Sequence, residues 1–126
     1  YDAGSVVEAN VSAYDPAYHM VTLETPGGGA LHITGKAQDV GRTLRVRIRA
    51  RDVAIATSEP KALSILNRFP GRIVDHCAGS EGMEELLLDV GFPLTARVTR
   101  KSFEDMGLAT DKKVWALVKS VTISPS

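Results

Sequence analysis

An internal repeat of about 65 to 70 residues limits the fold of this chain more than any single motif does. The segment VVEANVSAY corresponds to GRIVDHCAG, GGALHITGKAQDVG to FPLTARVTRKSFEDMG, and LRVRIRA to VWALVKS. The chain is therefore expected to contain two copies of one small unit. The best aligned columns pair Ile33 and Thr34 with Val98 and Thr99, Lys36 with Lys101, Asp39 with Asp105, Gly41 with Gly107, and Arg49 and Ala50 with Lys119 and Ser120.

Both copies are predicted to consist of β-strands, because apolar and polar residues alternate with a period of two over most of the sequence. The segment LRVRIRARDVAIA shows this most clearly, since an arginine stands at every second position. In a strand these arginines face one side and the apolar residues between them face the other. We expect the arginine side to be mostly charged surface; its members are Arg45, Arg47, Arg49 and Arg51.

Ten strands are predicted, over residues 5–14, 19–24, 30–34, 43–49, 53–56, 71–76, 85–90, 94–99, 113–119 and 121–124. Only RKSFEDMGL indicates a helix, with Ser102 expected to cap its first turn and Gly107 to end it. A polar segment around Pro60 separates the halves. The expected fold class is all-β, with tandem five-stranded barrels over residues 1–57 and 68–126, a linker over 58–67, and one short helix in the second barrel.

The charge balance argues against a nucleic-acid binder. Lys and Arg total 15 and Asp and Glu total 15, so a polyanion would meet no net attraction, and any anion site must be local. No apolar run approaches the roughly 20 residues that a membrane-spanning helix needs. The single cysteine excludes an internal disulfide, and no metal site is expected because His19, His32 and His76 lack metal-ligand spacing.

The segments RVRIRARDVAIA, SILNRFPGRIV, VTRKS and VWALVKSVTI together resemble the C-terminal regulatory region of the ATP-binding subunits of bacterial molybdate ABC transporters. The resemblance covers essentially the whole chain and implies oligonucleotide/oligosaccharide-binding (OB) barrels of the TOBE or Mop type. It implies molybdate or tungstate as the ligand. The chain has no Walker A motif or ABC signature, so we expect no enzyme activity and no cofactor, with ATP bound only by a domain outside this sequence.

The same resemblance implies which residues hold the oxyanion. Hydroxyls, backbone amides and a cation bind the anion in this family, and the matching positions here are Ser64, Asn67, Thr99, Ser102, Lys119 and Ser120. Weaker candidates are Arg49, Ala50 and Arg68. Leu66 stands where the family motif has an arginine, so one cation is missing, and Arg68 is the nearest substitute. The physical chemistry agrees, because a dianion removed from water needs donors for its oxygens and charge-assisted bonds are the strong ones.

Three functions from different classes remain open. The first is a cytoplasmic oxyanion-sensing module, working as a homodimer at the inner face of the membrane with an ABC ATPase domain and permease subunits. The second is a structural dimerisation module of an ABC ATPase that binds no ligand. The third is the effector domain of a molybdate-responsive transcription regulator, which shares the barrels but ordinarily lacks RARDVAIA.

Overall fold

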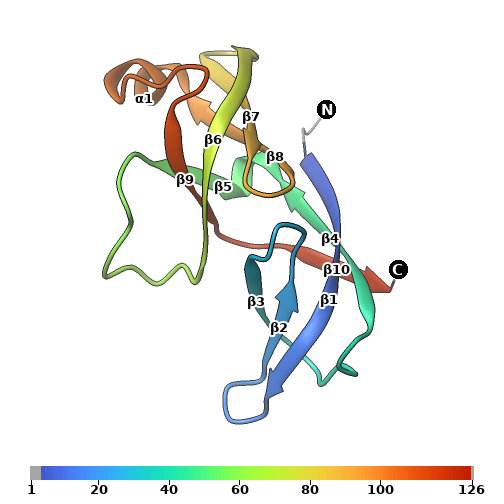
Figure 1. Ribbon diagram of the computed structural model, residues 1–126. Helices are drawn as coiled ribbons and strands as arrows, with labels where there is room; N and C mark the ends of the chain where they lie inside the picture. The colour runs from blue at the N-terminus through green and yellow to red at the C-terminus, as the bar shows by residue number, and fades with distance from the viewer. Residues whose placement is uncertain (1–3, 126) are drawn as a thin grey trace.

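In the computed structural model, which describes residues 4–125, the strands follow the predicted ones closely. The all-β fold of two five-stranded OB-like units, with one short α-helix in the second, is confirmed (Figure 1). The elements are β1 (Gly4–Asp15), β2 (Met20–Glu24), β3 (Ala30–Thr34), β4 (Thr43–Arg49), the 3-10 turn η1 (Ala50–Asp52), β5 (Val53–Ala56), β6 (Asn67–Ala78), β7 (Met83–Asp89), β8 (Pro93–Thr99), α1 (Arg100–Asp105), β9 (Lys113–Val118) and β10 (Thr122–Pro125).

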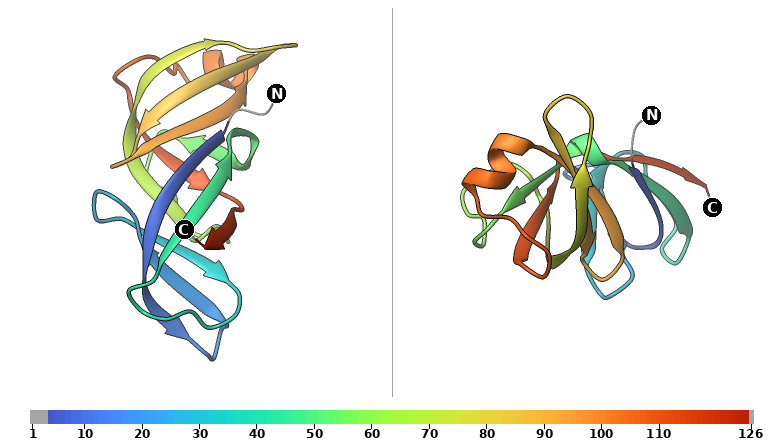
Figure 2. Two further views of the ribbon diagram at one scale, coloured as in Figure 1. Left: turned by 90° about the vertical axis from the view of Figure 1, so that its right-hand side faces the viewer. Right: turned by 90° about the horizontal axis from the view of Figure 1, so that it is seen from above.

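The two halves exchange their last strands. The sheets have the orders β10-β4-β1-β2-β3 and β5-β9-β6-β7-β8, so β5 pairs with β9 and β10 pairs with β4. Figure 2 shows the two units along one long axis, with β10 lying against the unit built from the N-terminal half. Sheet membership therefore crosses the predicted segments 1–57 and 68–126, and their status as separate domains stays a prediction. Alternation indicates that a segment is a strand, but it does not indicate which sheet the strand joins.

The repeat is visible in matching bulges on β1 and β6. At the first bulge Val11 N–H donates to Arg42 O at 2.8 Å and Gly41 N–H donates to Val11 O at 2.8 Å. At the second, Ile73 N–H donates to Lys112 O at 3.0 Å and Asp111 N–H donates to Ile73 O at 2.7 Å.

These matching bonds correct two columns of the sequence alignment. Gly41 corresponds to Asp111 and not to Gly107, and both Gly41 and Asp111 have a positive φ, of 92° and 72°. Asp39, whose carbonyl accepts from Arg42 N–H, corresponds in the same way to Ala109 and not to Asp105. The alignment failed because α1 lengthens this connection in the second half only.

Strand β4 buries one side and exposes the other, as its alternation predicts. Leu44, Val46 and Ile48 are at most 2% exposed and belong to a core shared by both sheets, whereas the three arginines of β4 face solvent. Arg51 departs from the prediction. It lies in η1 and not in the strand, because the chain leaves β4 at Ala50, whose side chain is fully buried.

Strand β6 begins at Asn67, four residues before the predicted start at Gly71. Pro70, which lacks an N–H, lies inside this early part of the strand. It nevertheless pairs with Trp115 inside the ladder between β6 and β9. The earlier start matters for function, because it fixes Asn67 at the junction of the two sheets.

Candidate functional site

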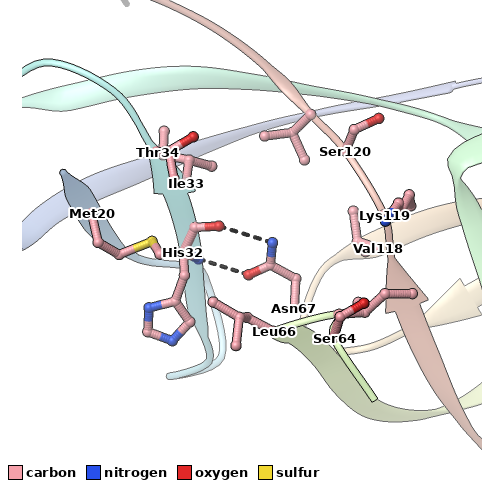
Figure 3. A pocket seen from close by; sticks show the side chains of 12 residues that line it. Met20, His32, Ile33, Thr34, Ser64, Leu66, Asn67, Val118, Lys119 and Ser120 are labelled. Carbon is pink, nitrogen blue, oxygen red and sulfur yellow. Dashed lines mark hydrogen bonds between the residues drawn. The ribbon is translucent and has the colours of Figure 1, made fainter. Parts of the chain in front are cut away.

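A pocket of about 300 Å³, here called pocket 1, lies where the edge of one sheet meets the other (Figure 3). One wall comes from β2 and β3, and the other from the segment before β6 and the crossover that follows β9. Four residues predicted from the sequence line it: Ser64, Asn67, Lys119 and Ser120. The remaining lining residues are Met20, His32, Ile33, Thr34, Ile65, Leu66, Val118 and Val121.

The polar residues of pocket 1 lie on both of its walls. Figure 3 shows Thr34 on β3 opposite Lys119 and Ser120, with Ser64 on the same side as Lys119. Within residues 4–125, none of these four side chains takes part in a hydrogen bond or ion pair. One full positive charge and three hydroxyl donors are thus free to bind an anion at this place.

Asn67 lines the same pocket but its amide is already engaged. The residue is 7% exposed. Its Oδ1 accepts from His32 N–H at 2.7 Å, and its Nδ2 donates to His32 O at 2.9 Å. The side chain therefore bridges the two walls of pocket 1 (Figure 3).

Thr99 and Ser102, the other two predicted residues, line a different pocket of about 350 Å³, here called pocket 2. It lies between β5 and β8, the two edge strands of the second sheet, beside α1. Lys119 contributes to it as well as to pocket 1. The predicted site residues are thus divided between two pockets that share one lysine. Pocket 2 also contains Arg51 and Arg97.

The helix cap is Thr99 and not Ser102. Thr99 Oγ1 accepts from Ser102 N–H at 3.0 Å and donates to Ser102 Oγ at 3.0 Å, while Thr99 itself keeps extended backbone angles. Ser102 lies within the first turn, so the prediction was displaced by one turn. Gly107 follows the helix with φ of 62°, in agreement with its expected role as the stop.

The weaker candidates have other structural roles. Arg49 donates from Nε to Asp52 Oδ2 at 3.0 Å, and the Ala50 side chain belongs to the interior. Arg68 donates to three backbone carbonyls, those of Ile65 at 2.7 Å, Leu63 at 2.8 Å and Pro60 at 3.1 Å. Its guanidinium therefore organises the loop before β6, and its part in anion binding stays a prediction.

The sequence analysis missed Thr34 and His32 as lining residues of pocket 1. The signal was present for Thr34, since the repeat aligns it with Thr99, and each of these threonines ends its strand beside one pocket. His32 could not be found in this way. Its side chain contacts Thr22, with 3.2 Å between Nδ1 and Oγ1, and its place at the pocket depends on the packing of one sheet against the other.

Two further reactive side chains, His76 and Cys77, lie outside the two pockets. His76 pairs with the buried Glu84 at 2.8 Å and packs on Phe103, and Cys77 is exposed. Within residues 4–125 no cluster of three or more His, Cys, Asp or Glu side chains is arranged to hold a metal ion. None of the helices in that range is long and apolar enough to cross a bilayer.

Comparison with known proteins places these pockets in context. Residues 63–124 match the TOBE domain family. Over 97% of its length, the chain is 38% identical to a molybdenum import ATP-binding protein, ModC, of Pseudomonas fluorescens and 37% identical to ModC of Bordetella pertussis. The chain spans about a third of the length of these relatives, 35% and 34%.

The fold also matches a solved structure. This is the cytoplasmic molybdate-binding protein ModG with molybdate bound, which superimposes with a TM-score of 0.86 over 97% of this chain and 96% of ModG. The sequences are 21% identical, so this comparison supports the fold alone.

Proposed function

Residues 63–124 belong to the TOBE domain family, and from this premise we propose that the chain binds a tetrahedral oxyanion, molybdate or tungstate, as the regulatory part of a molybdate importer. The relatives with 37% and 38% identity are ATP-binding proteins of molybdenum import, and ModG binds molybdate. These likenesses favour molybdenum oxyanions over other anions of the same shape.

The observation that carries the proposal is the composition of pocket 1. Lys119, Thr34, Ser64 and Ser120 line pocket 1 from three separate segments and bring an ammonium and three hydroxyls to it. An oxyanion taken out of water needs a donor for each oxygen, and hydrogen bonds from charged groups are the stronger ones. Pocket 1 supplies donors of both kinds. Thr99, Ser102 and the same Lys119 offer a second, less complete set in pocket 2.

In the intact protein we propose that this chain follows an ABC ATPase domain and acts as a homodimer in the cytoplasm, held at the membrane by permease subunits. Filling the pocket would favour one arrangement of the two ATPase subunits and so inhibit further uptake. Lys119 stands on a crossover between the sheets, and its N–H donates to Asp52 O on the other crossover at 2.8 Å. A ligand bound to Lys119 would therefore contact one of the two crossovers through which the sheets exchange strands.

The test is calorimetric titration of the 126-residue chain with molybdate, with tungstate, sulfate and phosphate as competitors. We expect saturable binding of molybdate and tungstate and much weaker binding of the other two anions. Absence of binding at millimolar molybdate would reject the proposal. It would favour the ligand-free dimerisation module, for which Leu66 is the supporting observation: it is 56% exposed at the rim of pocket 1 and apolar, as an interface residue would be.

A further inference from the structure

The Asn67 side chain makes the hydrogen bonds that a neighbouring strand would normally make to the edge of β3. The residue belongs to β6, where its backbone pairs with Val118 of β9, but its amide reaches across to β3 in the other sheet. There it bonds both backbone groups of a single residue, His32, accepting from N–H and donating to C=O. This is the double exchange that a hydrogen-bonded residue pair makes between antiparallel strands.

The bonds to His32 define which way the edge of β3 faces. In the ladder between β2 and β3, His32 is paired with Thr22 and Thr34 with Met20. The N–H and C=O of His32 point away from β2 and toward Asn67. Because the backbone groups of every second residue in a strand point the same way, the N–H and C=O of Thr34 also point away from β2. Thr34 is also a lining residue of pocket 1. Its N–H is thus presented at the edge that Asn67 holds.

The other half of the repeat has a comparable contact. Ser5, near the start of β1, accepts from Thr95 N–H on β8 at 2.9 Å. β8 is an edge strand of the second sheet as β3 is of the first, so in each half an early side chain of the first strand holds the edge strand of the opposite sheet. Ser5 makes one bond to that backbone and Asn67 makes two. The position is therefore a link between sheets in both halves, and at pocket 1 it engages both backbone groups of one edge residue.

We propose that Asn67 is a positioning residue for the oxyanion site and not one of its ligands. It holds β3 against β6 so that the N–H and hydroxyl of Thr34 lie opposite Lys119 and Ser120 across pocket 1. The inference deepens the proposed function and rests on it. It also replaces the direct binding role that the sequence resemblance implied for Asn67.

Two NMR measurements on the whole 126-residue chain test this role. In the unsubstituted protein, added molybdate should shift the Thr34 and Lys119 backbone amide signals more than the Nδ2 signals of Asn67. In Asn67→Ala, the His32 amide should exchange with solvent about tenfold faster or more, because the bond to Oδ1 is lost. Molybdate affinity should fall in the same variant, with the Thr34 response to molybdate diminished.

Two control variants separate positioning from binding. Ser64→Ala should weaken molybdate binding and leave His32 exchange unchanged. Asn10→Ala removes an amide that accepts from Thr43 Oγ1 at 2.7 Å, away from pocket 1, and should change neither quantity.

The outcomes distinguish the two proposals. If the Nδ2 signals of Asn67 shift most, or if His32 exchange is unaffected by Asn67→Ala, Asn67 is not a positioning residue. The first of these measurements needs no variant, so it decides the matter even if Asn67→Ala fails to fold. If the unsubstituted chain binds no molybdate, the proposed function fails and the positioning of an oxyanion fails with it, while faster His32 exchange would still establish the link between the sheets.

Discussion

Replacing Lys119 by alanine is the most direct perturbation of the proposed site. Within residues 4–125, pocket 1 is lined by one lysine, Lys119, by no arginine and by one histidine, His32. Lys119 also lines pocket 2. Leu66 stands where the family motif has an arginine, and the Arg68 guanidinium donates to three backbone carbonyls. In Lys119→Ala a dianion would therefore meet only neutral donors in pocket 1.

The size of the effect follows from the bond that is lost. A hydrogen bond to a charged group contributes about 1.5 to 3 kcal/mol. We therefore expect Lys119→Ala to weaken molybdate binding roughly tenfold to a hundredfold. The folded state should be little affected, because the Lys119 side chain is exposed and has no partner within residues 4–125.

The assay is calorimetric titration with molybdate, and Lys101→Ala is the matched control. Lys101 lies on α1 near pocket 2, but its side chain is 82% exposed and pairs with Asp105 at 2.9 Å. We expect its removal to change affinity little. The thermal unfolding midpoints of both variants without ligand should first be matched to the parent. Equal small losses in the two variants would refute the reasoning and make Lys119 ordinary surface.

Three further predictions follow from the fold and its charges. The chain should be a homodimer by light scattering at high micromolar concentration, and a strict monomer with and without molybdate would contradict this. Single-stranded DNA or RNA should bind no more tightly than roughly 10⁻⁴ to 10⁻⁶ M at physiological salt, because the net charge is zero; a sub-micromolar, salt-sensitive complex would overturn it. Phe69→Ala should lower the free energy of unfolding by about 3 to 5 kcal/mol in urea titrations. Phe69 is 2% exposed and packs edge-on against Phe92, with 5.6 Å between ring centroids. The control is Leu87→Ala, at a residue that is 39% exposed. Equal losses of unfolding free energy in the two variants would exclude a core role for Phe69.

The candidate site was only partly predictable from the sequence. Ser64, Lys119 and Ser120 were found because their short motifs resemble the family, and they do lie in one pocket. Thr99 and Ser102 were assigned to the same site; in this chain they line the other pocket, and their part in anion binding stays a prediction. This division between two pockets has a physical cause. The repeat places a threonine at the end of both β3 and β8, and the sequence alone does not indicate which of the two packs beside residues 64–67.

What the sequence by itself determined is the set of strands and the faces that are buried. These depend on neighbours along the chain: the alternation in β4 decides that Val46 is interior and Arg47 exposed, whatever sheet the strand joins. Only the tertiary structure decided the exchange of β5 and β10, the link from Asn67 to His32, and the presence of Lys119 in both pockets. Each of these depends on contacts between segments far apart in the chain, whose free energy comes from the packing of the two sheets and leaves no local periodicity to detect.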